Sequence, residues 1–123
     1  HRAIGAGLVR ACHDLSEGGL AAAAAEMAFA GGLGAQIDVA AMPTNDGTLT
    51  DVARLFSESN TRFLCEIEAD KASALERALG GIAFAKIGEV TDDRRLKICS
   101  GESKCIDADI FELKEAWQAP LRW

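Results

Sequence analysis

Four side chains that could take part in chemistry lie within five positions near the start of the chain. The segment ACHDLSEGGL, residues 11–20, contains His13, Asp14, Ser16 and Glu17, and two glycines follow them. Residues of these types serve active sites, bind phosphate groups or cap helices, so the types alone leave three interpretations open. The choice depends on the elements that position the segment.

A second polar segment, FSESNTRF, covers residues 56–63. Its hydroxyl, carboxylate and amide groups suit contact with a sugar or with a metal-bound phosphate. The alternative is a surface turn that joins a helix to a strand, since such turns are rich in Ser and Asn. The residue types favour neither of these two interpretations over the other.

The residue pattern argues against several common kinds of site. Neither Ser16 nor Ser59 has a base that the sequence identifies, and His13 beside Asp14 is no triad, because neighbours on a strand point to opposite faces. The GAG at residues 5–7 precedes a strand instead of following one, so it is no dinucleotide loop. The residues alone therefore identify no catalytic group in this chain.

The four cysteines indicate small buried thiols in a reducing compartment. They form no C-x-x-C pair, and the chain has only two histidines, so we expect neither a disulfide framework nor a zinc site. They are Cys12, Cys65, Cys99 and Cys105.

Composition describes an ordinary globular protein of one domain. The chain has 123 residues, of which 49% are hydrophobic and 26% charged. A net charge of -6 argues against nucleic acid or an anionic membrane as a partner. The longest apolar run, residues 20–25, is far shorter than the roughly 20 residues that span a bilayer, so we expect a cytoplasmic protein.

The periodicity of hydrophobic residues alternates between strand and helix along the chain. Strand patterns cover residues 8–15, 35–39, 62–68, 84–90, 96–100 and a short 104–106; helix patterns cover 20–30, 49–56, 71–79 and 110–119; residues 42–47 are expected to form a loop. This order predicts a single α/β (α+β) domain over residues 1–123, with a mixed sheet and helices packed on both of its faces.

The same patterns predict which side chains point inward and which cap helices. Asp70 and Asp109 are expected to cap the third and fourth helices, and Glu26 is the only charge on an otherwise enclosed first helix. The expected inward residues are Leu49, Val52 and Phe56 on the second helix, Phe63, Cys65 and Ile67 on the third strand, and Ile110, Leu113 and Trp117 on the last helix.

These elements place the opening segment at a corner between strand and helix. His13 and Asp14 end the strand, Ser16 lies in the corner, and Gly18 and Gly19 lead into the helix. Exposed N–H groups at such a helix start can hold a phosphate. From the residues alone we favour the simpler interpretation, in which Ser16 caps the helix and Asp14 bonds to backbone.

The two polar segments also resemble a known family. The runs ACHDLSEGGL, AEMAFAGGLGAQID, LFSESNTRFL and IGEV are similar, in order and spacing, to the final lobe of the large subunit of phosphoribosylformylglycinamidine synthase. A more distant resemblance extends to the C-terminal lobes of aminoimidazole ribonucleotide synthetase and selenophosphate synthetase. The resemblance implies the C-terminal lobe fold of the aminoimidazole ribonucleotide synthetase superfamily, and it covers nearly the whole chain.

The resemblance implies a parent ligase of purine biosynthesis that uses ATP and Mg²⁺. Such an enzyme converts formylglycinamide ribonucleotide to its amidine with ammonia from a glutaminase component. Because the chain opens on HRAIGAG with no initiator Met, we expect it to be excised from the C-terminal part of that enzyme. The family's catalytic histidine and ATP-binding lobes precede this one, so the fragment alone is expected to be inactive and to hold no certain cofactor.

The resemblance also implies roles for particular residues. Asp14 would contribute to a magnesium-nucleotide site, and Asn60 departs from the Gln or Ala that often follows Ser-Glu-Ser in the family. The implied nucleotide or phosphate site contains His13, Asp14, Ser16, Gly18 and Gly19, and the implied substrate-facing loop contains Glu58, Ser59 and Asn60.

Two other functions stay open on the sequence. The lobe would serve as a non-catalytic module that supports an ATP-binding lobe and holds no ligand, or it would be the equivalent lobe of selenophosphate synthetase. In either case a lobe separated from its partner exposes apolar surface, so we expect the fragment to form homo-oligomers.

Overall fold

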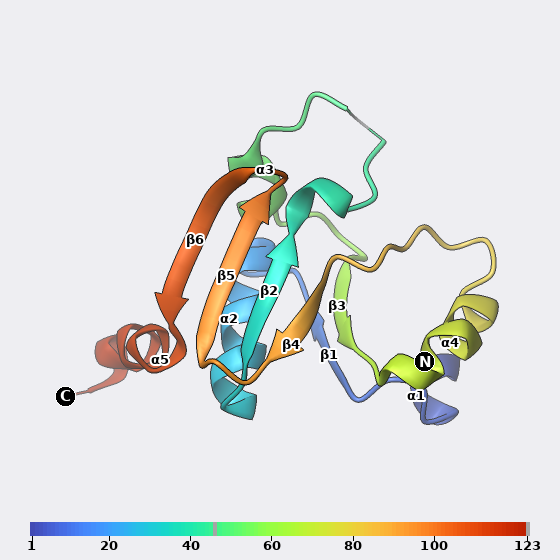
Figure 1. Ribbon diagram of the computed structural model, residues 1–123, viewed down its shortest axis with the longest axis horizontal. Helices are drawn as coiled ribbons and strands as arrows, with labels where there is room; N and C mark the ends of the chain where they lie inside the picture. The colour runs from blue at the N-terminus through green and yellow to red at the C-terminus, as the bar shows by residue number, and fades with distance from the viewer. Residues whose placement is uncertain (46, 123) are drawn as a thin grey trace.

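One long helix, α2, packs on a face of a four-stranded sheet, and a separate two-stranded ladder lies beside this helix (Figure 1). The computed structural model describes residues 1–45 and 47–122. The helices are α1 Arg2–Gly5, α2 Gly19–Gly31, α3 Asp51–Phe56, α4 Ala72–Ala78 and α5 Ile110–Gln118, and the strands are β1 Ala11–Asp14, β2 Gly34–Asp38, β3 Phe63–Glu66, β4 Gly88–Thr91, β5 Arg95–Ser100 and β6 Ser103–Asp109. Short 3-10 turns cover Val39–Ala41, Ala69–Lys71 and Ala119–Leu121.

The larger sheet is mixed, as predicted. Its strand order is β4-β2-β5-β6, in which β2 and β5 are parallel and the other pairs are antiparallel. The smaller ladder joins β1 and β3 in antiparallel register. This arrangement confirms the α/β class with a mixed sheet.

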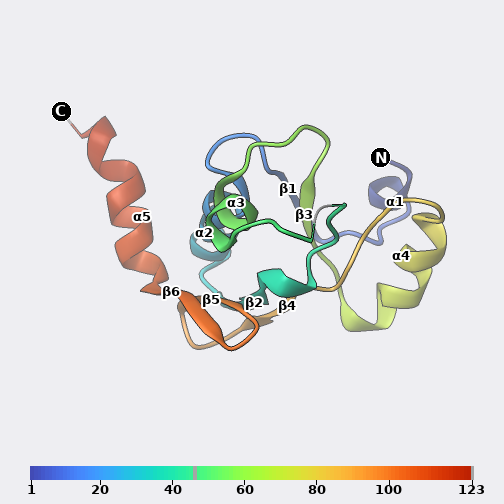
Figure 2. The same cartoon turned by 90° about the horizontal axis from the view of Figure 1, so that it is seen from above.

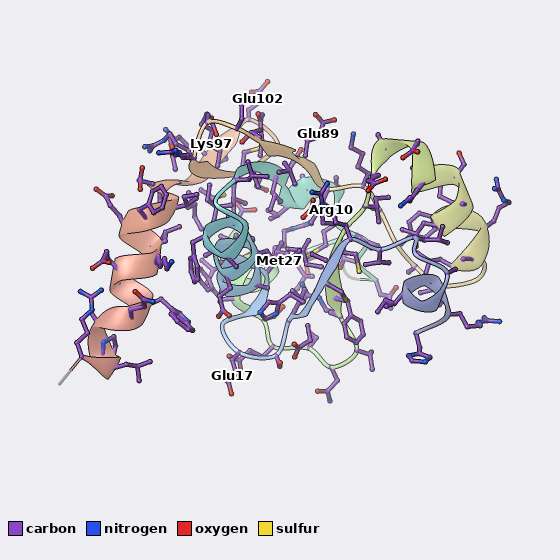
Figure 3. All side chains as sticks on the ribbon, turned by 90° about the horizontal axis from the view of Figure 1, so that it is seen from below. Arg10, Glu17, Met27, Glu89, Lys97 and Glu102 are labelled. Atoms are coloured by element: carbon purple, nitrogen blue, oxygen red, sulfur yellow. The ribbon has the colours of Figure 1, made fainter. Side chains whose placement is uncertain are left out.

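The helices that pack on the four-stranded sheet lie on one of its faces, and the prediction of helices on both faces is wrong. Figure 2 shows α2, α3 and α5 on the same side of the sheet. Ile37 and Ile98 are buried on that side, whereas their neighbours Gln36 and Lys97 are paired on the other. Figure 3 shows Lys97 and Glu89 directed away from α2. Polar side chains on alternate positions leave this second face to solvent.

Alanines let α2 pack closely against the sheet. Leu20 at its start is 1% exposed, and Glu26 stays the only charged residue along its length. The buried core consists of Leu15, Leu20, Ala21, Ala23, Ala24, Ala28, Ile37, Val39, Leu55, Leu96, Ile98 and Ile110. The predicted enclosure of this helix is confirmed, and the packing fixes the position of its N-terminus.

The β1–β3 ladder is more exposed than the sequence pattern predicts. We expected a buried strand over residues 8–15, but β1 is only four residues long and alternates between half-buried and exposed. In β3 the expected phase is reversed: Phe63 and Cys65 are exposed, and Leu64 packs against the core. A two-stranded ladder covers only one face, and a shift of one residue turns every side chain to the other face.

The buried stripe of α3 also differs from the prediction. Val52 is 67% exposed and Phe56 51% exposed, whereas Leu55 is buried at 5%. The helix begins later than expected, at Asp51, because Thr50 caps it through a hydrogen bond from the N–H of Ala53 at 3.2 Å. With only six residues, it turns a single side chain into the core.

Of the two predicted aspartate caps, one is confirmed. Asp109 accepts hydrogen bonds from the N–H groups of Phe111 and Glu112 at 2.8 and 3.2 Å, and Ile110 is fully buried behind it. Asp70 does not cap α4, because it lies inside the preceding 3-10 turn. Trp117 was expected to be buried but is half exposed, and its ring lies 5.7 Å from that of Phe29.

Other predicted boundaries change more modestly. The strand expected over 84–90 is confined to β4, and the short strand expected over 104–106 becomes the seven-residue β6. The loop predicted over 42–47 includes Asp46, which lies outside the described residues.

Cys12 and Cys65 are exposed free thiols, so the prediction that they are buried is wrong. Within residues 1–45 and 47–122, no helix is long and apolar enough to cross a membrane.

The close approach of α2 to α3 makes Gly19 a sensitive position. Its φ is +65°, and a Cβ there would lie 2.8 Å from the carbonyl oxygen of Leu55 and 2.9 Å from the backbone of Phe56. We expect Gly19→Ala to lower the free energy of unfolding by about 2 kcal/mol, through backbone strain and overpacking. Chemical denaturation measures the change.

Gly31→Ala is the matched control for this substitution. A Cβ at Gly31, at the other end of the same helix, would have no atom within 4 Å. We expect this variant to change stability by less than about 1 kcal/mol, in the stabilising direction. Equal losses in the two variants would contradict the close contact between α2 and α3.

Candidate functional site

The two polar segments meet at the N-terminus of α2. The N–H of Gly18 donates a hydrogen bond to Oε1 of Glu58 at 2.9 Å, across 40 positions of sequence. The carboxylate therefore lies where the helix presents unpaired N–H groups and the positive end of its dipole. This contact joins the strand-to-helix corner and the loop after α3 into one candidate site.

Two glycines with positive φ shape the start of the helix. Gly18 has a φ of +72° and Gly19 one of +65°, values that residues with side chains rarely adopt. A Cβ at Gly18 would lie 2.6 Å from Cβ of Ala22, one turn further along. Both glycines are therefore needed to turn the chain from the end of β1 into α2.

Ser16 does not cap α2, contrary to the simpler interpretation of the sequence. Gly18 is the N-cap residue, and the hydroxyl of Ser16 donates instead to Oδ2 of Asp14. This bond, together with the backbone N–H of Asp14, lowers the pKa of the Asp14 carboxyl. Asp14 is thus an exposed anion at neutral pH, held by a hydroxyl at the end of β1.

His13 is directed toward α2 and uses both of its ring nitrogens within the chain. Its Nδ1–H donates to the backbone carbonyl of Asp14 at 2.6 Å, and Nε2 lies 3.3 Å from Oε2 of Glu26. The bond to the Asp14 backbone raises the pKa of His13, and Glu26 raises it further, against the opposing effect of burial. An imidazolium donates at both positions, so this environment favours the charged form.

Glu26 is a member of the site that the sequence analysis missed. It was recognised as the only charged residue on an enclosed helix, but its partner was not. A single carboxylate among alanines is the available signal, because a half-buried charge needs a partner. The spacing of thirteen residues between His13 and Glu26 gives no indication of the pairing.

Arg62 is the second missed member, and it holds the loop at residues 57–61 in place. Its Nη1 donates to Oγ of Ser57 at 2.7 Å and to the Ser57 carbonyl at 3.3 Å. Its own carbonyl accepts from the N–H of Leu15 at 3.1 Å. Arg62 thereby ties the second polar segment to the first. The signal in the sequence is one cation at the end of a run of hydroxyl, carboxylate and amide side chains.

The tip of this loop is exposed and contains an unusual backbone conformation. Glu58, Ser59 and Asn60 are all exposed, and Thr61 next to them has a φ of +64°. A positive φ is uncommon for a β-branched residue and accompanies functional loops as well as tight turns. The Thr61 hydroxyl donates to the carbonyl of Asn60 at 2.6 Å, which fixes the turn.

The charges of the site are mostly negative. Asp14 and Glu58 contribute carboxylates, and Figure 3 shows Glu17 pointing away from the body of the protein beside the start of α2. Among the residues that the structure describes, no group of three or more His, Cys, Asp or Glu side chains could hold a metal ion. A divalent cation here would therefore need phosphate oxygens and water to complete its ligands.

Comparison with known proteins gives the family. The family model described as "AIR synthase related protein, C-terminal domain" matches residues 1–99. The chain belongs to this family. The resemblance predicted from the sequence motifs and the C-terminal lobe fold are thereby confirmed.

Relatives within the family include curated and solved proteins. Phosphoribosylformylglycinamidine synthase subunit PurL of Limosilactobacillus reuteri is 41% identical over 117 residues, which are 94% of this chain and 14% of that protein. The chain thus spans about a seventh of the length of this curated relative.

Solved structures of PurL from Thermotoga maritima share the fold of this chain. The complex with ATP has a TM-score of 0.82 at 24% identity, and the match covers 91% of this chain and 20% of that one. The complex with FGAR has a TM-score of 0.82 at 25% identity, and the match covers 91% of this chain and 19% of that one. The structure of PurLQS from the same organism has a TM-score of 0.79 at 25% identity, over 89% of this chain and 19% of that one.

The His13–Glu26 pair predicts a pH dependence. Because the pKa of His13 is raised from 6.5, the stabilisation from its charged form is complete below about pH 6.5 and is lost as the pH rises through the raised pKa. Glu26→Gln removes the negative partner. We expect NMR of the 123-residue chain to show a lower titration midpoint for His13 in this variant.

Glu112→Gln is the matched control, because Glu112 is an exposed carboxylate in the first turn of α5. We expect this variant to leave the His13 midpoint unchanged. In thermal unfolding, the melting temperature of the unchanged chain should exceed that of Glu26→Gln at about pH 5.5, and this difference should shrink toward about pH 8.5. A His13 midpoint that does not move in the variant would show that Glu26 is not its partner.

Proposed function

We propose that this chain is the C-terminal lobe of a phosphoribosylformylglycinamidine synthase, a cytoplasmic ligase of purine biosynthesis. The whole enzyme would convert formylglycinamide ribonucleotide to its amidine with ATP and ammonia. Identity of 41% to a PurL subunit over nearly the entire chain supports this proposal, as do the PurL structures with ATP, ADP, AMPPCP and FGAR. The observation that carries it is the hydrogen bond between Gly18 and Glu58, which joins the two motifs that characterise the family.

The role of the lobe would be to bind and orient a magnesium nucleotide. The Glu58 carboxylate already lies against the N-terminus of α2, and Asp14 is ionised nearby, so a bare phosphate would meet repulsion. Magnesium, when bound, would neutralise the phosphate charge. Asp14 is the donor that suits this ion, because magnesium is commonly held by one or two carboxylates together with phosphate oxygens.

The other site residues would position the Asp14 carboxylate or face the bound nucleotide or substrate. Ser16 orients the Asp14 carboxylate through its hydroxyl, and His13 fixes the backbone of Asp14 through its carbonyl. Gly18 and Gly19 would shape the turn into α2, since the N–H of Gly18 is held by Glu58 and Gly19 packs against the end of α3. Glu58, Ser59 and Asn60 form the exposed loop that would face the substrate.

The lobe would act together with other parts of the enzyme. ATP-binding lobes of the parent chain and a glutaminase component that supplies ammonia are the partners we propose, and the PurLQS structure of Thermotoga maritima supports an assembly of this kind. Residues 1–123 would form one domain of that parent. Alone, the domain is expected to hydrolyse no ATP, because it contributes no catalytic residue.

A second candidate function is that of a supporting lobe with no ligand of its own. His13 uses both ring nitrogens within the chain, and Glu58 occupies the helix N-terminus, which are features of a closed structural corner. Exposed apolar side chains would then cover a neighbouring lobe or a second copy of the chain. They include Val52 and Phe56 on α3 and Phe63 on β3.

Asp14→Asn separates the two functions. We expect this variant, made in the natural protein that contains this sequence, to weaken binding of magnesium ATP by about tenfold, or 1.4 kcal/mol. Stability should change little, because the amide keeps the shape of the side chain and still accepts the Ser16 hydroxyl. Isothermal titration and thermal unfolding measure both quantities.

Two further variants complete this test. Ser16→Ala removes the hydroxyl that orients Asp14, so we expect a smaller loss of nucleotide affinity, of about threefold. Glu112→Gln alters an exposed carboxylate in the first turn of α5 and should leave affinity unchanged. Unchanged affinity in Asp14→Asn together with a marked loss of stability would favour the supporting lobe.

A further inference from the structure

Two cysteines face each other across the small ladder beside the candidate site. Cys12 of β1 and Cys65 of β3 are direct register partners, and their Sγ atoms lie 3.5 Å apart. Both are free thiols, and both residues are exposed. Figure 1 shows β1 and β3 side by side, and Figure 2 shows them apart from the four-stranded sheet. The pair is therefore within reach of a small reagent from solvent.

The position of the pair in the ladder suits a covalent bond. Just beyond the ladder, the N–H of Leu15 donates to the carbonyl of Arg62. Hydrogen-bonded pairs alternate along antiparallel strands, so His13 with Leu64 is also such a pair and Cys12 with Cys65 is not. Non-hydrogen-bonded partners have Cα atoms about 4.5 Å apart, which lies within the span of a disulfide.

We propose that Cys12 and Cys65 form a reversible disulfide by exchange with a small disulfide oxidant, which makes this pair a site of thiol modification. One thiolate attacks the oxidant RSSR, forming a mixed disulfide and releasing RS⁻. The second thiolate then attacks the protein sulfur of that mixed disulfide, and the second RS⁻ leaves. Two cysteine thiols are thus oxidised and one RSSR is reduced to two RSH, with the two protons passing to the released thiolates.

The environments of the two thiols give the order of attack. Burial of the sulfur, and then the hydrogen bond to Cys12, raise the pKa of Cys65 to about 11. Cys65 is therefore protonated at neutral pH and is a poor first nucleophile. Cys12 would react first with the oxidant. Cys65, already in contact with the Cys12 sulfur, would then lose its proton and complete the exchange.

The bond would fasten the strands that support the candidate site. The β1–β3 ladder has only four register pairs, and His13 and Asp14 follow Cys12 directly. A cross-link between residues 53 positions apart limits the separation of the two strands. This inference rests on the geometry of the ladder and does not depend on the proposed function.

The other two cysteines provide a contrast within the same chain. Cys99 is half-buried and its register partner is Lys104, while the thiol of Cys105 donates to the carbonyl of Ser103. In the pairing of β5 with β6, neither cysteine is the register partner of the other. Cys99 and Cys105 are thus suited as controls for the specificity of the reaction.

Trypsin digestion distinguishes all four cysteines, because each lies on a different peptide. Cleavage after Lys and Arg places them on residues 11–54, 63–71, 98–104 and 105–114. We would incubate the natural protein that contains this sequence with excess oxidised glutathione at about pH 8. Free thiols would then be blocked, and the protein would be digested without reductant. The expected product is peptide 11–54 joined to peptide 63–71, and it should disappear after reduction with dithiothreitol.

Two substitutions test the assignment. Cys99→Ser should leave the cross-linked peptide unchanged, and Cys12→Ser should abolish it. Absence of the joined peptide in the unchanged protein, with Cys12 and Cys65 recovered as separate glutathione adducts or as free thiols, would overturn the proposal. Recovery of either cysteine joined to Cys99 or Cys105 would overturn it as well.

Discussion

The start of α2 lies so close to the end of α3 that no side chain fits between them. Gly19 allows this approach, and the polypeptide that leaves α3 then places Glu58 against the N–H of Gly18. An anionic side chain at this position compensates the partial positive charge of the helix N-terminus. The remainder of the site depends on this contact, because it brings the loop after α3 to the end of β1.

The same contact decides what kind of ligand the corner accepts. A helix start that is open to solvent attracts phosphate, but here the Glu58 carboxylate already occupies it. A second carboxylate, that of Asp14, belongs to a residue only four positions before Gly18. The net negative charge favours a cation, or an anion that is bound to a cation. Arg62 offsets part of this charge, yet its guanidinium is directed at Ser57 within the loop.

Much of this arrangement was predictable from the sequence. The alanine-rich helix, the mixed sheet and the Asp109 cap follow from periodicity and from local hydrogen-bonding preferences, and all three are observed. The two polar segments were recognised as candidates by residue type and by their resemblance to a family. Their meeting at Gly18 is a tertiary contact across 40 residues, which no local pattern encodes.

The errors have a common physical cause. Alternation in β3 gives two equivalent phases, and only the packing of Leu64 on the core selects between them. The sequence suggests a regular stripe of Leu49, Val52 and Phe56. Leu49 precedes α3, which packs on the core through Leu55 and leaves Val52 and Phe56 in solvent. The pairing of His13 with Glu26 was likewise set by proximity in the folded chain, whereas Ser16 bonds to its near neighbour Asp14 instead of capping the helix.

The amide proton of Gly18 gives the most direct test that Glu58 caps α2. In the 123-residue chain with labelled glycine, the hydrogen bond to Glu58 should protect the Gly18 amide from exchange with solvent. We predict that this amide exchanges faster in Glu58→Ala than in the unchanged chain, and that Ser59→Ala leaves its exchange rate unchanged. An exchange rate for Gly18 that is the same in the unchanged chain and in Glu58→Ala would contradict the account.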